Sequence, residues 1–114
     1  MEEQKIDLDF FWKECEKWVE KFSLHEYWWM CDEVEDTLTD GWAEAIVCHK
    51  TMTVLVRIKA EVFGQEDAEK IVRRIAYHEV CETMLTVFQE NMTGNQREQA
   101  RHSVLNKIAY ALGV

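Results

Sequence analysis

Residues 42–60 read WAEAIVCHKTMTVLVRIKA and predict two β-strands, over 42–49 and 52–60, joined by a tight turn at 49–51. In the second strand apolar residues occupy every other position, at Met52, Val54, Val56 and Ile58. This period of two is typical of a strand with one apolar, half-buried face. Because so short a turn cannot cross over to a parallel neighbour, we expect the sheet to be mostly antiparallel.

The segments on either side of these strands predict helices. Apolar residues recur every three or four positions over 7–22, which indicates one amphipathic helix, and Asp7 and Asp9 are its candidate caps. Residues 66–92 predict a long helix, and residues 96–112 predict a final one after a turn.

Residues 26–34 are rich in aromatic side chains and predict a third strand. Adjacent Trp28 and Trp29 then face opposite sides of the sheet, and we expect the first helix to cover whichever lies outside the main core. The whole pattern predicts a single α+β domain over 1–114. Its expected order is an N-terminal helix, a three-stranded mostly antiparallel sheet and two C-terminal helices.

Composition excludes several classes of protein. The chain has 114 residues, of which 47% are hydrophobic, enough to close one core. Its 13 basic and 22 acidic residues give a net charge of −9, which repels phosphate backbones and anionic membranes. We therefore expect no nucleic-acid partner and no membrane. The start, Met1 to Lys5, lacks the pattern of a secretory signal.

The four cysteines indicate a reducing compartment. They lie at Cys15, Cys31, Cys48 and Cys81, far apart and without a CxxC pair. Each lies in an apolar stretch, where a free thiol behaves as a small hydrophobic side chain. We expect no disulfides and a cytoplasmic location.

Residues 78–82 read HEVCE, an HExxE string within the long helix. Helical geometry places His78 and Glu82 one above the other, on a stripe that also holds Ile71, Ile75 and Leu85. Burying an unpaired carboxylate costs several kcal/mol, so a bound divalent cation would explain a core-facing Glu82. Glu79 would then lie where it can take a proton from water.

A zinc site needs a third protein ligand, and His102 is the best placed of the remaining histidines. It follows Glu82 by 20 residues, and an antiparallel helix pair would bring it back toward the motif. The predicted site is therefore a zinc ion held by His78, Glu82 and His102, with Glu79 as the catalytic base. The alternative is an ordinary helical string whose glutamates pair with Arg73 or Arg74.

Residues 75–85 (IAYHEVCETML), with 101–105 (RHSVL) downstream, resemble a group of small phage-encoded proteins assigned as zinc metallopeptidases. The resemblance covers roughly residues 26–110. It implies a reduced zincin fold in the host cytoplasm, the same three metal ligands and the same base. The second motif position is Glu here, where His is commoner.

Two functions remain open. The first is a minimal zinc-dependent metallopeptidase, in which an edge strand aligns an extended peptide or protein substrate. The second is a small acidic phage protein that inhibits a host protein by occupying a basic surface, with a non-catalytic HExxE string. Either a monomer or a homodimer is compatible with the sequence.

Overall fold

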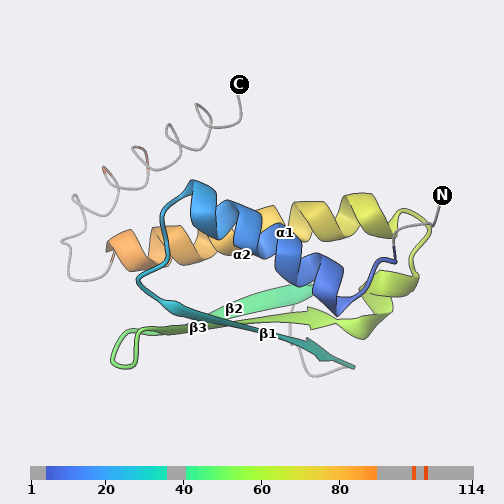
Figure 1. The fold of residues 1–114 in the computed structure, drawn as a ribbon, viewed down its shortest axis with the longest axis horizontal. Helices are drawn as coiled ribbons and strands as arrows, with labels where there is room; N and C mark the ends of the chain where they lie inside the picture. Colours follow the sequence, from blue (N-terminus) through green and yellow to red (C-terminus); the bar gives the residue numbers. More distant parts are fainter. Residues whose placement is uncertain (1–4, 36–40, 90–98, 100–101, 103–114) are drawn as a thin grey trace.

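The computed structural model describes residues 5–35 and 41–89, together with Gln99 and His102. In chain order its elements are α1 (Leu8–Lys21), β1 (Trp28–Val34), β2 (Ala43–Cys48), β3 (Thr53–Lys59), the short 3-10 helix η1 (Ala60–Gly64) and α2 (Ala68–Gln89). They form two layers, with both helices on one face of the sheet (Figure 1). The α+β class predicted from the sequence is confirmed.

The sheet is mixed, with strand order β1-β3-β2. β2 pairs with β3 in the antiparallel direction, as the tight turn predicts, whereas β1 pairs with β3 in parallel, Trp28 opposite Thr53. Our expectation of a mostly antiparallel sheet was therefore wrong for the β1–β3 pair. The turn at 49–51 fixes the direction of β2 against β3 only. A longer connection separates β1 from β2, so β1 is free to lie on the far side of β3.

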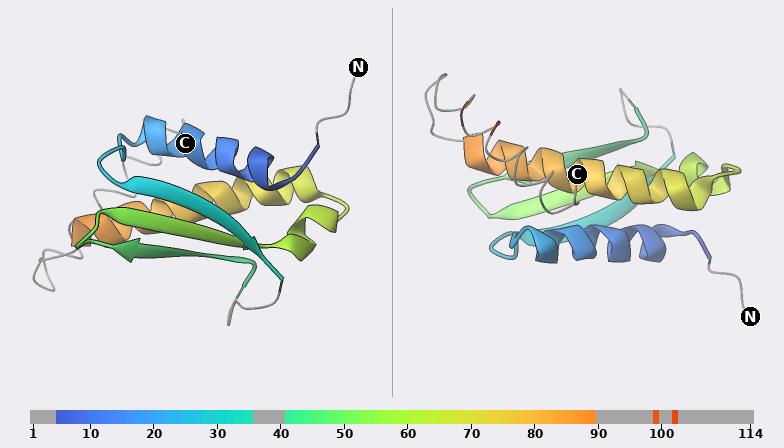
Figure 2. Two further views of the ribbon diagram at one scale, coloured as in Figure 1. Left: turned by 60° about the horizontal axis from the view of Figure 1, so that its bottom comes forward. Right: turned by 90° about the horizontal axis from the view of Figure 1, so that it is seen from above.

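The two helices begin and end close to their predicted bounds. At the start of α1 the Asp7 carboxylate accepts a hydrogen bond from the N–H of Phe10 at 3.0 Å, a side-chain N-cap. Seen from above, α1 lies toward β1 and α2 lies toward β2 (Figure 2). The final helix predicted over 96–112 falls outside the described residues, except that Gln99 and His102 are helical and exposed.

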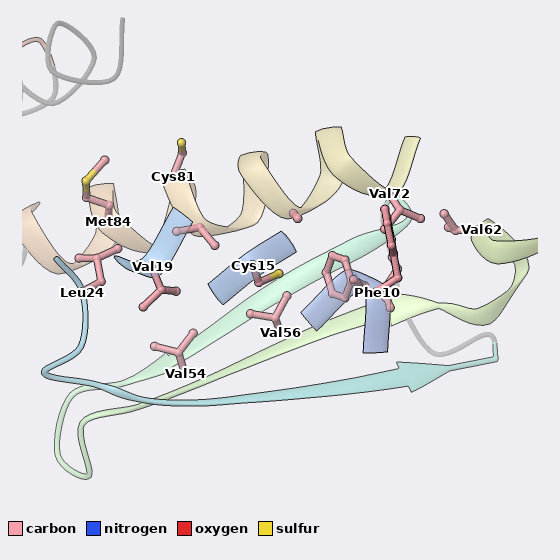
Figure 3. Close-up of a cluster of buried hydrophobic side chains, with 14 residues drawn as sticks. Phe10, Cys15, Val19, Leu24, Val54, Val56, Val62, Val72, Cys81 and Met84 are labelled. Carbon is pink, nitrogen blue, oxygen red and sulfur yellow. The ribbon is translucent and has the colours of Figure 1, made fainter. Parts of the chain in front are cut away.

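The core lies between the two helices and the sheet (Figure 3). Because β3 is the central strand, the alternate residues Val54, Val56 and Ile58 are completely buried, which confirms the predicted period of two. The helices contribute fully buried side chains at Phe11, Cys15, Val72, Ala76 and Val80.

The opposite face of the sheet carries exposed apolar side chains. Trp28, Met30 and Ile46 are 71%, 43% and 46% exposed, whereas Trp29 packs against the core. Our expectation that the first helix covers the tryptophan outside the main core was therefore wrong, because both helices lie on the face to which Trp29 points and Trp28 points to the other face (Figure 1). All four cysteines are free thiols. In the described part of the chain no helix has the length and apolar character needed to cross a membrane.

Candidate functional site

The HExxE residues lie on α2 where this helix passes over β2. Contrary to our expectation, Glu82 does not face the interior, because its side chain is 58% exposed and that of His78 is 64% exposed. The buried carboxylate belongs instead to Glu79, which is 7% exposed. The surface of α2 that contacts the sheet consists of smaller residues, Val72, Ala76, Val80 and Thr83, which allow close packing.

The stripe of large residues on α2 lies at the edge of this contact surface. Ile71, Ile75 and Leu85 are only half-buried. A helical wheel weighted by Ile and Leu therefore predicts the wrong buried face for α2. The predicted face lies roughly one residue around the helix from the face that is buried in the structure.

His78 and Glu82 form a pair across one helical turn, as their spacing predicts. His78 Nε2 lies 3.4 Å from Glu82 Oε1. Arg73 contacts Glu69 at 2.9 Å and Glu14 at 3.7 Å. Within residues 5–35 and 41–89, neither Glu79 nor Glu82 pairs with an arginine or lysine, so the ordinary ion pair that we considered for the motif is not formed there.

Glu79 combines burial with access to a groove. No hydrogen bond or ion pair to its carboxylate is formed by the described residues. The pKa of Glu79 is raised from 4.5 to about 7, chiefly by burial; His78 opposes the shift, and neighbouring Glu82 and Glu44 contribute to it. A carboxyl group with this pKa both gives and takes protons near neutral pH, the property that a general base requires.

The groove lies between α2 and β2 and encloses about 320 Å³. The helix contributes His78, Glu79 and Glu82, together with Thr83 and Thr86. The strand contributes mainly small side chains, including Ala43 and Ala45, which leave space beneath the helix. A second hollow of about 420 Å³ shares His78 and Glu79 and continues toward Trp42 and Gly41.

β2 presents to this groove a backbone edge that pairs with no other strand among residues 5–35 and 41–89. The N–H of Lys59 donates to the Trp42 carbonyl at 2.8 Å, which sets the alternation of the antiparallel ladder. With the observed register, Ala43, Ala45 and Val47 direct their N–H and C=O groups away from β3. Their side chains point to the helix layer, so the free backbone groups and the HExxE residues border one space.

His102 is not brought to this groove. It is a helical, exposed residue, and no group of three His, Cys, Asp or Glu side chains able to hold a metal ion forms among the described residues. The structure thus brings together His78, Glu79 and Glu82 and leaves His102 apart. The edge-strand residues Ala43 and Ala45 were missed by the sequence, where their only signal is small size within a strand.

Comparison with protein-family models, curated proteins and solved structures gave no match to the chain. Function must therefore be inferred from the groove itself. Its distinguishing features are one imidazole, the exposed carboxylate of Glu82, the buried carboxyl of Glu79, and a strand edge that no other described strand covers. Glu44 of β2 also borders the groove and contacts Arg57 at 3.6 Å. Together the distinguishing features provide two metal-ligating atoms, one proton-transfer group and a row of backbone hydrogen-bonding groups.

Proposed function

We propose that the protein is a minimal zinc-dependent metallopeptidase whose active site is the groove between α2 and β2. The observation that carries the proposal is the buried, unpaired carboxyl of Glu79 beside the His78–Glu82 pair. Buried ionisable groups with shifted pKa values concentrate at functional sites, since a fold retains this cost only where chemistry needs it.

The donor atoms fit zinc in type and in spacing. Imidazole nitrogen and carboxylate oxygen are both common zinc ligands, and two ligands of a tetrahedral site lie about 3.3 Å apart. The 3.4 Å between His78 Nε2 and Glu82 Oε1 agrees with this value. The chemistry that bound zinc supplies is Lewis-acid polarisation of water and of a peptide carbonyl. His102, the third ligand predicted from the sequence, lies apart from this pair in the structure, so the groove itself supplies two of the three ligands.

Glu79 supplies the proton transfers. Its carboxylate takes a proton from the attacking water, and the carboxylic acid then returns the proton to the leaving amine. In the metal-free groove its pKa is raised to about 7, so that the two protonation states of Glu79 are nearly equal in free energy at neutral pH.

The free edge of β2 positions the substrate. An extended peptide that pairs with the backbone groups of Ala43, Ala45 and Val47 lies along the groove, with its main chain beside the HExxE residues. Because the strand side chains here are small, the peptide can approach the helix closely. Main-chain pairing of this kind favours unfolded or flexible segments over folded ones.

The experiment measures metal content and peptide cleavage on protein purified without a histidine tag. We expect one zinc per chain after zinc loading and dialysis. His78→Ala and Glu82→Ala lose the metal, whereas Glu79→Gln retains zinc and cleaves unfolded casein about a hundredfold more slowly. His25→Ala, an exposed histidine away from the groove, serves as the matched control and keeps both properties.

Two results would contradict the proposal. One is a chain that retains no zinc under these conditions. The other is a Glu79→Gln variant that cleaves casein at the wild-type rate, since this would remove the base from the mechanism.

A further inference from the structure

The sheet has a second edge, β1, on the side opposite the HExxE groove (Figure 1). The N–H of Trp28 donates to the Met52 carbonyl at 2.7 Å, which fixes the alternation of the parallel ladder. With the observed register, Trp29, Cys31 and Glu33 direct their backbone groups away from β3. Among residues 5–35 and 41–89, no other strand pairs with these groups.

An aromatic groove follows this edge between α1 and β1. It consists of two adjoining hollows of about 510 and 500 Å³, and both are bordered by Trp12 of α1 and Trp29 of β1. The first extends to Tyr27 and is also lined by charged residues of α1, and the second extends to Cys31. The charged residues are Lys13, Glu16, Lys17 and Glu20. A strand added to β1 would place every second side chain on the helix side of the sheet, and therefore into this groove.

The first half of β1 carries no charged residue, proline or bulge that would hinder strand addition, and its charged residues Asp32 and Glu33 lie in the second half. Exposed edges are commonly blocked by lysine, proline or a bulge. The strand reads WWMCDEV, with no lysine or proline, and all seven residues pair in register with β3. Its first half exposes Trp28 and Met30. An edge of this composition favours pairing with another segment.

The charge of β1 indicates which residue types a bound segment should contain. Asp32 and Glu33 are exposed on β1 and form no ion pair with a lysine or arginine in the described part of the chain; Arg57 lies opposite Asp32 in the strand register but contacts Glu44 at 3.6 Å. The nearby α1 lysines are already paired, Lys13 with Asp9 at 3.0 Å and Lys17 with Glu14 at 3.0 Å. The second half of β1 therefore attracts basic residues. A second copy of this chain is a poor occupant, because it brings the same acidic pair and a further charge of −9.

We propose that the β1 edge binds an extended segment of a partner protein that has basic residues followed by alternating apolar residues. The segment runs antiparallel to β1, with its basic residues beside Asp32 and Glu33 and its apolar side chains in the Trp12–Trp29 groove. This site is separate from the HExxE groove and does not depend on the proposed peptidase activity.

The probe is a fluorescein-labelled peptide, acetyl-Lys-Arg-Leu-Thr-Leu-Thr-amide, followed by fluorescence anisotropy with the full chain. We expect saturable binding below about 100 µM that weakens as salt is added. In the proposed register the leucine N–H groups point to β1 and the threonine N–H groups point away. Methylation of the two leucine amides therefore lowers affinity about tenfold or more, and methylation of the two threonine amides leaves it unchanged.

A pair of protein variants tests the same edge from the other side. Glu33→Pro removes the backbone N–H that points to the partner, and Glu33→Thr removes the same charge but keeps this N–H. We expect the proline variant to bind about tenfold more weakly than the threonine variant. Glu82→Gln, at the opposite edge, leaves the affinity unchanged.

Four results of the binding experiments would overturn the proposal. They are absence of binding, equal affinity of the two Glu33 variants, equal effects of the two methylated peptides, and loss of binding in Glu82→Gln. A homodimer in light scattering that Glu33→Pro dissociates would also overturn it, because the edge would then belong to a second copy. The methylated peptides keep the test valid if the proline variant fails to fold.

Discussion

Replacing Glu79 by Gln should make the metal-free protein more stable at neutral and alkaline pH. The substitution keeps the shape of the side chain and removes only its charge. In the folded chain burial raises the pKa of this carboxyl from 4.5 to about 7. The folded state thus holds the Glu79 proton more tightly than the unfolded state does, and stability falls as pH rises from 4.5 to 7.

The magnitude follows from the same shift. At 1.36 kcal/mol for each pKa unit, the full shift corresponds to roughly 3.4 kcal/mol of lost stability above pH 7. The carboxyl borders the solvent of the groove, which screens part of this penalty. We therefore expect Glu79→Gln to raise the free energy of unfolding by about 2 kcal/mol near pH 8, and by less than about 0.5 kcal/mol near pH 4.

The assay is urea unfolding followed by tryptophan fluorescence, with a chelator present, across this pH range. Glu82→Gln is the control, because this exposed side chain should change stability little at either pH. A gain of equal size at acid and alkaline pH would refute the reasoning, since it could not arise from the charge. No gain near pH 8 would show that the Glu79 carboxylate has a partner or is well solvated.

Three further predictions concern the scaffold. Phe11→Ala empties a completely buried site and should lower the free energy of unfolding by about 3–5 kcal/mol, measured in urea. Asp7→Ala removes the side-chain cap of α1 and should cost about 1 kcal/mol in the same assay, whereas an unchanged midpoint would mean that this cap contributes nothing. Cys48 is exposed and its pKa is lowered by hydrogen bonds from Thr51, so it should react with iodoacetamide first. Burial raises the pKa of the Cys15 thiol, so mass spectrometry of the labelled chain should show Cys15 unmodified.

Local periodicity was sufficient to predict most of the elements. The alternation at Val54, Val56 and Ile58 identified the buried face of β3, because a strand turns its side chains by a fixed half-turn per residue. The i, i+4 spacing likewise placed His78 beside Glu82. Both results depend only on geometry within one element.

What could not be predicted depends on how elements meet. The parallel direction of β1 is set by its pairing with β3, a strand that is distant in the sequence. No short turn joins the two strands, so the local sequence does not indicate their relative direction. The orientation of α2 depends on which residues fit closest to the sheet, and there small Ala76 displaces larger Ile75 from the contact. The orientation of α2 about its axis decides which carboxylate is buried. Glu79 is therefore buried and Glu82 exposed, the reverse of our expectation.

The strand order explains why one small sheet can carry two different sites. Since β3 lies in the middle and pairs on both sides, β1 and β2 each keep one unpaired backbone edge. The helix over each edge then sets its chemistry. Over β2, α2 contributes ionisable groups at His78, Glu79 and Glu82, which suit catalysis. Over β1, α1 contributes Trp12 together with the acidic residues Glu16 and Glu20, which suits binding of a segment with apolar and basic residues. A chain in which β1 paired antiparallel with β2 would bury the edge of β2 that borders the HExxE groove and lose this division.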